Sequence, residues 1–177
     1  LMVKRLETLS LISNNNENKI VVTNLEGFLK FVPKKDNIVN QDIVIKINDN
    51  FKRTDLEDKL FQYGYNKTSI VTSTGEYSVR GFIIDLFPYN YDKPIRIEFF
   101  GDEIESIRLF DTDTQKSLKN VKDLVVYPFT EFLMDENENI DDDYRKQKYL
   151  PKYNKVCSIG KYLEDPIVVY KDFSQLK

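Results

Sequence analysis

Histidine is absent from this sequence, and cysteine occurs once, at Cys157. Without an imidazole, the chain has no Ser-His or Cys-His nucleophile system and lacks the commonest ligand of zinc. A single thiol forms no internal disulfide and fits a reducing compartment. These shortages exclude a metal site built from thiolates and imidazoles, and they predict a cytoplasmic protein.

Long hydrophobic runs and a surplus of either charge are also missing. No segment approaches the roughly 20 apolar residues that cross a bilayer, and the first residues lack the apolar stretch and cleavage site of a signal peptide. The 26 Lys and Arg residues nearly balance the 29 Asp and Glu residues, so bulk charge gives little support to DNA binding. With 41% apolar residues, the 177-residue chain can still form a core. We expect no membrane partner.

Motifs that would carry catalysis are incomplete. The acidic run 135–143 does not follow the ligand order of a calcium loop, and we interpret it as an exposed connection. The segment VCSIGKY has Gly160 and Lys161 but no earlier glycine to surround a phosphate. Glu103 and Glu105 lie on one face of an expected strand, but solvated strand edges also carry such pairs. We therefore predict no catalytic residue, cofactor or metal ion in this chain.

The first part of the chain alternates between helical and strand patterns. Residues 6–11 predict a short amphipathic helix, and the apolar run KIVVT follows it. Thr23 and Glu26 have the spacing of a capping box, which predicts a helix that Pro33 ends. The segment DIVIKI alternates strictly and predicts a half-buried strand. This order is typical of an α/β layer.

The middle of the chain is rich in short β patterns. A second capping box, Thr54 with Glu57, predicts a helix that closes at Gly64 in a left-handed cap. Five β-rich runs follow between residues 69 and 127, namely SIVTS, EYSVRGFIIDLF, IRIEFF, EIESIRLF and DLVVYP. Their close spacing leaves no room for crossover helices, so we expect a mainly antiparallel sheet.

These patterns together predict an α+β fold with three parts. Residues 1–47 would end a first α/β flank, residues 48–128 would form an antiparallel module with a packed helix, and residues 129–177 would return into the flank. The sequence starts in mid-pattern and stops after DFSQLK, where the pattern indicates the start of a new element. We therefore expect a fragment of a longer protein.

The segment IRIEFF carries the functional hypothesis. Strand alternation places Phe99 in the core and turns Phe100 to the opposite face, beside Arg96 and Glu98. If the strand EYSVR lies in the same sheet, Arg80 shares that outer face. An aromatic residue among arginines and a carboxylate is typical of protein interfaces. The alternative is a Phe100 buried under a flanking helix, with Arg96 and Glu98 as charge partners across strands.

A series of ordered motifs carries a family resemblance. GYNK, GEYSVRG, IIDLFP, IRIEFFGDEIESIRLFD and TQKS closely resemble the UvrB-homology region of the bacterial transcription-repair coupling factors, the Mfd family. The match is dense from about Gly64 to Pro128 and looser in the flanks. The excision-repair protein UvrB shares several of these elements and is the alternative, although DTDTQKS favours the coupling factors.

The resemblance implies a module that binds UvrA, the damage-recognition ATPase of nucleotide excision repair. Family residues of that contact match Arg80, Arg96 and Phe100, with Glu98 at the acidic position between the last two. Lys67 replaces an arginine of the GY motif in UvrB, and we expect a weaker role because lysine lacks the bidentate fork. Phe82 stands where the family usually has a small or acidic residue. On this basis Arg96→Ala or Phe100→Ala should weaken UvrA binding while the fold is kept.

The resemblance also implies a larger parent protein. That parent resembles an ATP-dependent DNA translocase that displaces stalled RNA polymerase, so ATP, Mg²⁺, DNA and polymerase would bind to its other parts. A C-terminal domain of the parent would cover the UvrA-binding face until polymerase is engaged. None of the helicase motifs occurs in this chain, and we expect the fragment itself not to hydrolyse ATP.

Overall fold

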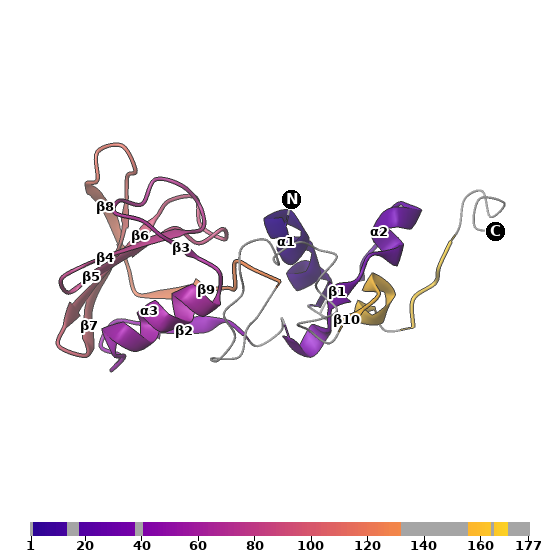
Figure 1. Cartoon of the computed structure of the whole chain (residues 1–177), viewed down its shortest axis with the longest axis horizontal. Coiled ribbons are helices and arrows are strands. Elements are labelled where there is room, and N and C mark those ends of the chain that lie inside the picture. Colours follow the sequence, from indigo (N-terminus) through magenta and orange to yellow (C-terminus); the bar gives the residue numbers. More distant parts are fainter. Residues whose placement is uncertain (1, 14–17, 38–40, 132–155, 164, 170–177) are drawn as a thin grey trace.

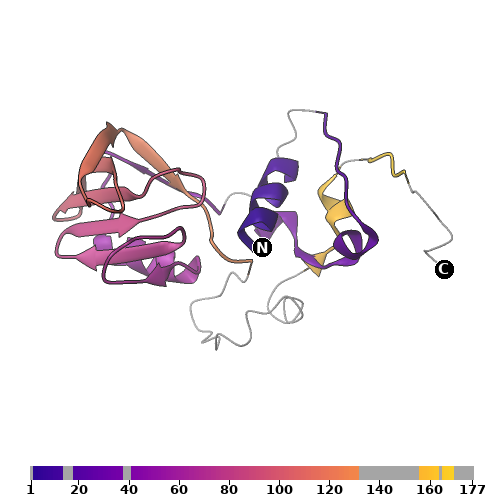
Figure 2. The ribbon, with the colours of Figure 1, turned by 90° about the horizontal axis from the view of Figure 1, so that it is seen from above.

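The fold is taken from a computed structural model, which describes residues 2–13, 18–37, 41–131, 156–163 and 165–169. Residues 41–131 form a β-rich part, and the other described residues form a smaller flank beside it (Figure 1). The view from above shows the same two parts (Figure 2). Helices and mainly antiparallel sheets confirm the α+β class.

The largest sheet has six strands in the order β3-β4-β5-β6-β7-β8. Its neighbouring strands are antiparallel, apart from the parallel pair of β3 and β4. A second, two-stranded antiparallel sheet joins β2 to β9. The strands of this part are β2 (Ile43–Lys46), β3 (Asn66–Lys67), β4 (Glu76–Arg80), β5 (Ile83–Leu86), β6 (Ile95–Phe100), β7 (Glu103–Phe110), β8 (Ser117–Val121) and β9 (Asp123–Val126).

Two tight turns fold the middle strands into hairpins. Gly81 has φ +60° between β4 and β5, and Gly101 has φ +65° between β6 and β7. Glycine enters this left-handed region without strain, and such turns match the twist of the strands they connect. The single run EYSVRGFIIDLF is therefore two strands, and both turns lie at the same end of the sheet.

One face of the sheet packs against helix α3 (Arg53–Gln62) and the β2–β9 pair, as Figure 1 illustrates. Alternate residues of the strands are buried there because successive side chains of a strand point to opposite faces. This core contains Ile45, Leu56, Leu60, Tyr77, Ile84, Leu86, Ile95, Ile97, Phe99, Ile104, Ile107, Leu124 and Val126. The opposite face of the sheet carries the intervening polar residues.

Helix α3 ends as the sequence predicts but begins differently. Gly64 has φ +78°, its N–H donates to the Phe61 carbonyl, and the Tyr65 N–H donates to the Leu60 carbonyl. These two bonds form a Schellman cap. The capping box at Thr54 is wrong, because the helix starts at Arg53 after a residue whose side chain makes no capping hydrogen bond.

Helix α2 is shorter than the sequence predicts. It spans only Leu25–Leu29, and Asn24 is its N-cap, with Oδ1 accepting from the Gly27 N–H at 2.8 Å. Asn24 competes successfully with Thr23 because both side chains can satisfy the free N–H groups of the first turn. The chain then enters β1 (Val32–Pro33), so Pro33 belongs to a strand instead of ending the helix.

Several β predictions also need correction. SIVTS is a loop, in which Val71 is buried, and the apolar run KIVVT (residues 19–23) forms no strand. Strand β8, in contrast, was not predicted, because SLKNV is polar and largely exposed. The acidic run 135–143 lies outside the described residues. The domain boundary expected after Ile47 stays a prediction.

The flank has a small core of its own. Helix α1 (Met2–Ser13) packs against β1 and the 3-10 turn Ile159–Tyr162, and β1 pairs with β10 (Val156–Cys157). The Tyr162 hydroxyl donates to the Pro33 carbonyl at 2.6 Å. Arg5 of α1 forms an ion pair with buried Glu131, which connects the flank to the end of the β-rich part.

Candidate functional site

The outer face of the six-stranded sheet, opposite α3, collects the predicted site residues. We use the term outer face for Arg80, Asp85, Arg96, Glu98, Phe100 and Arg108. Residues paired across strands share a face, and the register pairs Arg80 with Ile83, Asp85 with Arg96, and Arg96 with Arg108. The prediction that Arg80, Arg96, Glu98 and Phe100 share one face of one sheet is confirmed.

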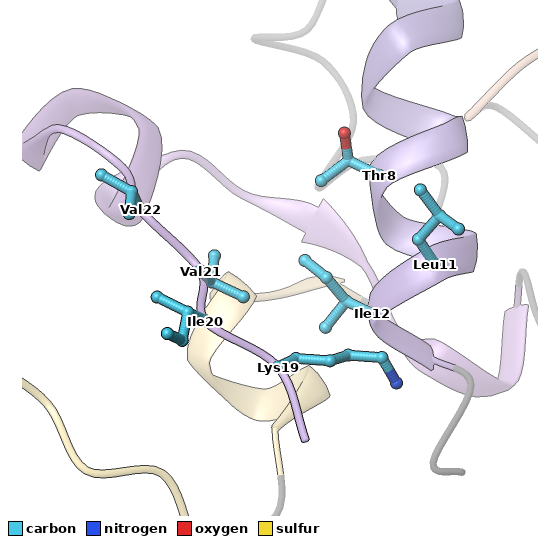
Figure 3. A pocket seen from close by; sticks show the side chains of 7 residues that line it. All are labelled: Thr8, Leu11, Ile12, Lys19, Ile20, Val21 and Val22. Atoms are coloured by element: carbon cyan, nitrogen blue, oxygen red, sulfur yellow. The ribbon is translucent and has the colours of Figure 1, made fainter. Parts of the chain in front are cut away.

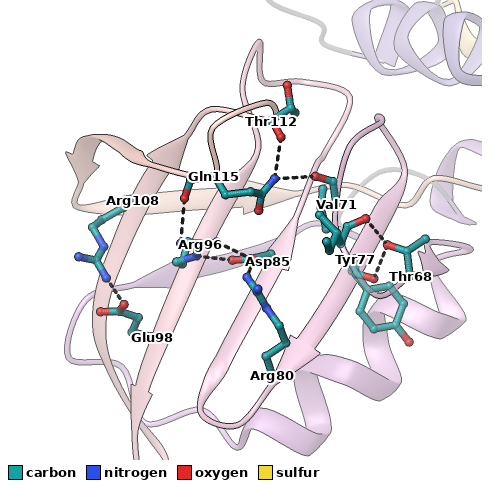
Figure 4. Close-up of polar contacts among 11 residues, drawn as sticks. Thr68, Val71, Tyr77, Arg80, Asp85, Arg96, Glu98, Arg108, Thr112 and Gln115 are labelled. Atoms are coloured by element: carbon teal, nitrogen blue, oxygen red, sulfur yellow. Dashed lines mark hydrogen bonds and ion pairs between the residues drawn. The ribbon is translucent and has the colours of Figure 1, made fainter.

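Asp85 lies at the centre of this face and holds both predicted arginines (Figure 4). Its carboxylate accepts from Arg96 through Nε at 2.7 Å and Nη2 at 2.9 Å, and from Arg80 through Nη2 at 2.6 Å. The Asp85 side chain is only 1% exposed. The pair with Arg96 is bidentate, which is the strongest geometry for a guanidinium and a carboxylate.

Arg96 is enclosed on several sides, and its side chain is 14% exposed. Its guanidinium carbon lies 4.7 Å from the centre of the Phe110 ring, and Nη1 donates to the Gln115 carbonyl at 3.4 Å. The hydrogen bond with Asp85 raises the pKa of Arg96 above its ordinary value. Arg96 is therefore a fixed, permanently charged group.

A contact between two loops covers the outer face next to Arg96. The Gln115 side-chain amide donates to the Thr112 carbonyl at 2.7 Å and to the Val71 carbonyl at 3.4 Å (Figure 4). These bonds join the loop before β4 to the loop between β7 and β8, next to Arg96. The predicted SIVTS strand is absent because this segment crosses the end of the sheet as a loop.

Glu98 also has a charge partner on a neighbouring strand. It forms an ion pair with Arg108 of the neighbouring strand, and Oε2 accepts from the Ser106 hydroxyl at 2.8 Å. The alternative's expectation that Arg96 and Glu98 are charge partners across strands is therefore confirmed, with Asp85 of β5 as the partner of Arg96 and Arg108 of β7 as the partner of Glu98.

Phe100 is 77% exposed, which confirms that it faces solvent and overturns the alternative of a buried side chain. It pairs with Glu103 at the end of β6, beside the Gly101 turn. Phe100 does not lie between Arg96 and Arg80, since β5 separates β4 from β6 and Phe100 lies four residues beyond Arg96. The end of the outer face at the Gly81 and Gly101 turns, which we call the open end, thus carries Phe100 and Arg80, and the Gln115 contact lies at the other end.

Phe82 does not lie on the outer face with Arg80. It lies in the two-residue turn directly before Ile83, and Ile83 shares its face with Arg80. Its carbonyl accepts from the Phe99 N–H at 2.9 Å, and its side chain is exposed. Phe82 therefore lies at the same end of the sheet as Phe100 without belonging to the outer face by alternation.

Lys67 is separate from the other four predicted residues. It pairs in register with Tyr77, a core residue, and its amino group lies 2.5 Å from Glu57 of α3. That bond raises the pKa of Lys67. The structure places Lys67 on the helix side of the sheet and not on the outer face.

Sequence reasoning missed Asp85 and Arg108. The signal for Asp85 was its place in IIDLF, where a carboxylate interrupts an apolar strand. Buried charges are rare unless they are paired, so such an aspartate predicts a cationic partner, but not which one.

The other described surfaces offer no reactive set. No group of three or more metal-ligating side chains occurs in the described parts of the chain. The segment Lys19–Val22 lines a hollow beside α1 together with Thr8, Leu11 and Ile12 (Figure 3), and this lining is mostly aliphatic. None of the described helices has the length and apolar character needed to cross a membrane. Arginine donors and an exposed aromatic side chain suit recognition of a surface better than chemistry.

The β-rich part of the chain is similar to a known family of domains. The family model described as the UvrB interaction domain matches residues 43–132, about half of the chain. The chain therefore belongs to the UvrB interaction domain family. The match spans β2 to β9, including the whole outer face.

Particular relatives are the transcription-repair-coupling factors, which bear out the resemblance read from the sequence. The protein of that name from Staphylococcus aureus (strain USA300) is 33% identical over 136 residues, which cover 77% of this chain and 12% of the relative. The one from Bacillus subtilis (strain 168) is 29% identical over 134 residues, or 76% of this chain and 11% of the relative. The chain thus spans about an eighth of the length of these curated relatives.

Proposed function

We propose that this chain is a protein-interaction module of a transcription-coupled DNA repair factor, and that its outer face binds UvrA. Membership of the UvrB interaction domain family and similarity to transcription-repair-coupling factors support this role. The proposed parent protein is a DNA translocase that displaces stalled RNA polymerase. Within it, this module recruits the repair machinery and does not itself catalyse a reaction.

The observation that carries the proposal is the exposed Phe100 at the open end of a charged strand face. A phenylalanine side chain exposed to 77% leaves a large apolar area in water, and burying it against a partner is favourable. Arg80 lies on the same face with a side chain that is 47% exposed, and among the described residues its hydrogen bond is with Asp85. Its remaining N–H groups are available as directed donors.

This combination fits a protein partner with an apolar recess and an acceptor beside it. Phe100 would act as the anchor that excludes water, and Arg80 would bond a carboxylate or carbonyl of the partner in the dry environment so formed. The guanidiniums of the outer face are offset by Asp85, Glu98 and Glu103, the residue paired with Phe100, which leaves too little positive charge for a phosphate backbone, whose binding needs several neutralised phosphates. We therefore favour UvrA over DNA as the ligand of this face.

A calorimetric titration with Phe100→Ala tests the proposal. Truncation of an interface anchor should weaken UvrA binding by at least about 2 kcal/mol, or roughly 30-fold. Phe61→Ala is the matched control, because Phe61 is a similarly exposed phenylalanine on α3, on the other side of the sheet. Equal UvrA affinities for the wild type and Phe100→Ala would exclude the outer face as the binding site.

A further inference from the structure

Asp85 is a buried carboxylate that no feature of the sequence assigned to binding. It accepts three charge-assisted hydrogen bonds, two from Arg96 and one from Arg80, on the face of the sheet opposite α3. We propose that Asp85 is a positioning residue, which presents the Arg80 guanidinium to the partner. The inference rests on the proposed function, and it adds a residue that does not touch the partner.

The core gives no reason for a carboxylate at this position. Asp85 points away from α3, on the face opposite Ile84 and Leu86, and its cross-strand neighbours are Ser78 and Arg96. A buried ion pair is weak support for stability, because well-packed apolar residues of similar volume are often as stable. What the carboxylate supplies instead is a fixed plane and fixed distances for two guanidiniums.

The two arginines depend on Asp85 in different ways. Arg96 is also held by the Phe110 ring and the Gln115 carbonyl, so its place in the sheet has several supports. Arg80 is half exposed and, among the described residues, bonds Asp85 through Nη2. Loss of the Asp85 charge should therefore release Arg80 more than Arg96.

Restraint of Arg80 before binding lowers the entropy lost on binding. An arginine has many rotamers in solution, and immobilising such a side chain at an interface weakens association severalfold. Asp85 also fixes Nη2, which leaves the other N–H groups of the half-exposed guanidinium for a contact with the partner. The same carboxylate leaves Arg80 and Arg96 together with one net positive charge, which an acidic partner group can neutralise.

A double-mutant cycle on UvrA binding tests this role. Asp85→Asn keeps the side-chain shape and should weaken binding by about three- to tenfold, the range set by ordering one such side chain. Arg80→Ala should then cost clearly less affinity in the Asp85→Asn background than in the wild type, because the asparagine no longer orders Arg80. A purely structural Asp85 would give additive losses. Asp58→Asn, which removes one carboxylate from the exposed side of α3, should leave affinity unchanged.

The outcomes separate this inference from the proposed function. If wild-type chain fails to bind UvrA, the proposed function is wrong and the inference with it. If the wild type binds and Asp85→Asn binds equally well, or the two losses add, only the inference is overturned. Should Asp85→Asn fail to fold, the side-chain Nε–Hε signal of Arg80 in the wild type decides by nuclear magnetic resonance relaxation. Order close to that of the backbone supports positioning, and free rotation overturns it.

Discussion

The charged centre of the outer face predicts unequal stability losses for two neighbouring arginines. Arg96→Ala would leave the Asp85 carboxylate, only 1% exposed, with a single hydrogen bond from Arg80. Breaking a buried ion pair costs about 3 to 5 kcal/mol, and because the bond from Arg80 remains, we expect a loss of about 3 kcal/mol here. The lost contact with the Phe110 ring adds about 1 kcal/mol. We predict that Arg96→Ala lowers the free energy of unfolding by about 3 to 4 kcal/mol.

Arg80→Ala is the comparison within the same cluster. Its guanidinium is half exposed and its removal leaves the bidentate bond between Arg96 and Asp85 intact, so we expect a loss of about 1 kcal/mol or less. Urea unfolding followed by far-UV circular dichroism measures both values. Equal losses for the two variants would refute the view that Arg96 is the structural partner of Asp85. Because Arg96→Ala is expected to disturb the fold, Arg80 and Phe100 are the better probes of binding.

Two further predictions concern a glycine and an aspartate. Gly75→Ala should destabilise the fold by about 2 to 5 kcal/mol, since φ is +87° and a Cβ would lie 2.3 Å from the Phe129 ring. Gly81→Ala, at φ +60° with open space around it, should cost about 1 to 2 kcal/mol. Urea unfolding measures both losses. Similar losses for both would contradict the clash. Hydrogen bonds, foremost from the Thr114 N–H, lower the pKa of Asp111 to about 2, so this group contributes stability above its unfolded pKa of about 4 and loses it as the pH falls toward 2. In the Asp111→Asn variant, the melting temperature should therefore change less between about pH 4 and about pH 2 than in the wild type. If the melting temperatures of the two proteins fell in parallel over this range, Asp111 would not make this contribution.

Alternation was enough to predict the outer face, because the period of two along IRIEFF fixes which side each residue takes. Phe100 is exposed and Phe99 is buried for that reason alone. The helix end at Gly64 was also predictable, since only a left-handed residue closes a Schellman cap without strain. Both features depend only on residues that are close together in the sequence, so they can be predicted from the sequence alone.

The centre of the site depends on register, which the sequence does not display. Asp85 meets Arg96 only because β5 and β6 pair at those two positions, and a shift by one residue would turn Asp85 to the core face. The loop contact of Gln115 with the Val71 carbonyl joins segments 44 residues apart. Strand β8 was missed because a polar, exposed edge strand lacks the alternation by which strands are found.

Hydrogen–deuterium exchange of the chain with and without UvrA tests the central claim most directly. We predict that saturating UvrA slows exchange at residues 80–83 and 98–103, the two turns at the open end of the outer face, and leaves α3 unchanged. Protection confined to α3 or to the flank, or no protection at either turn, would contradict UvrA binding by the outer face.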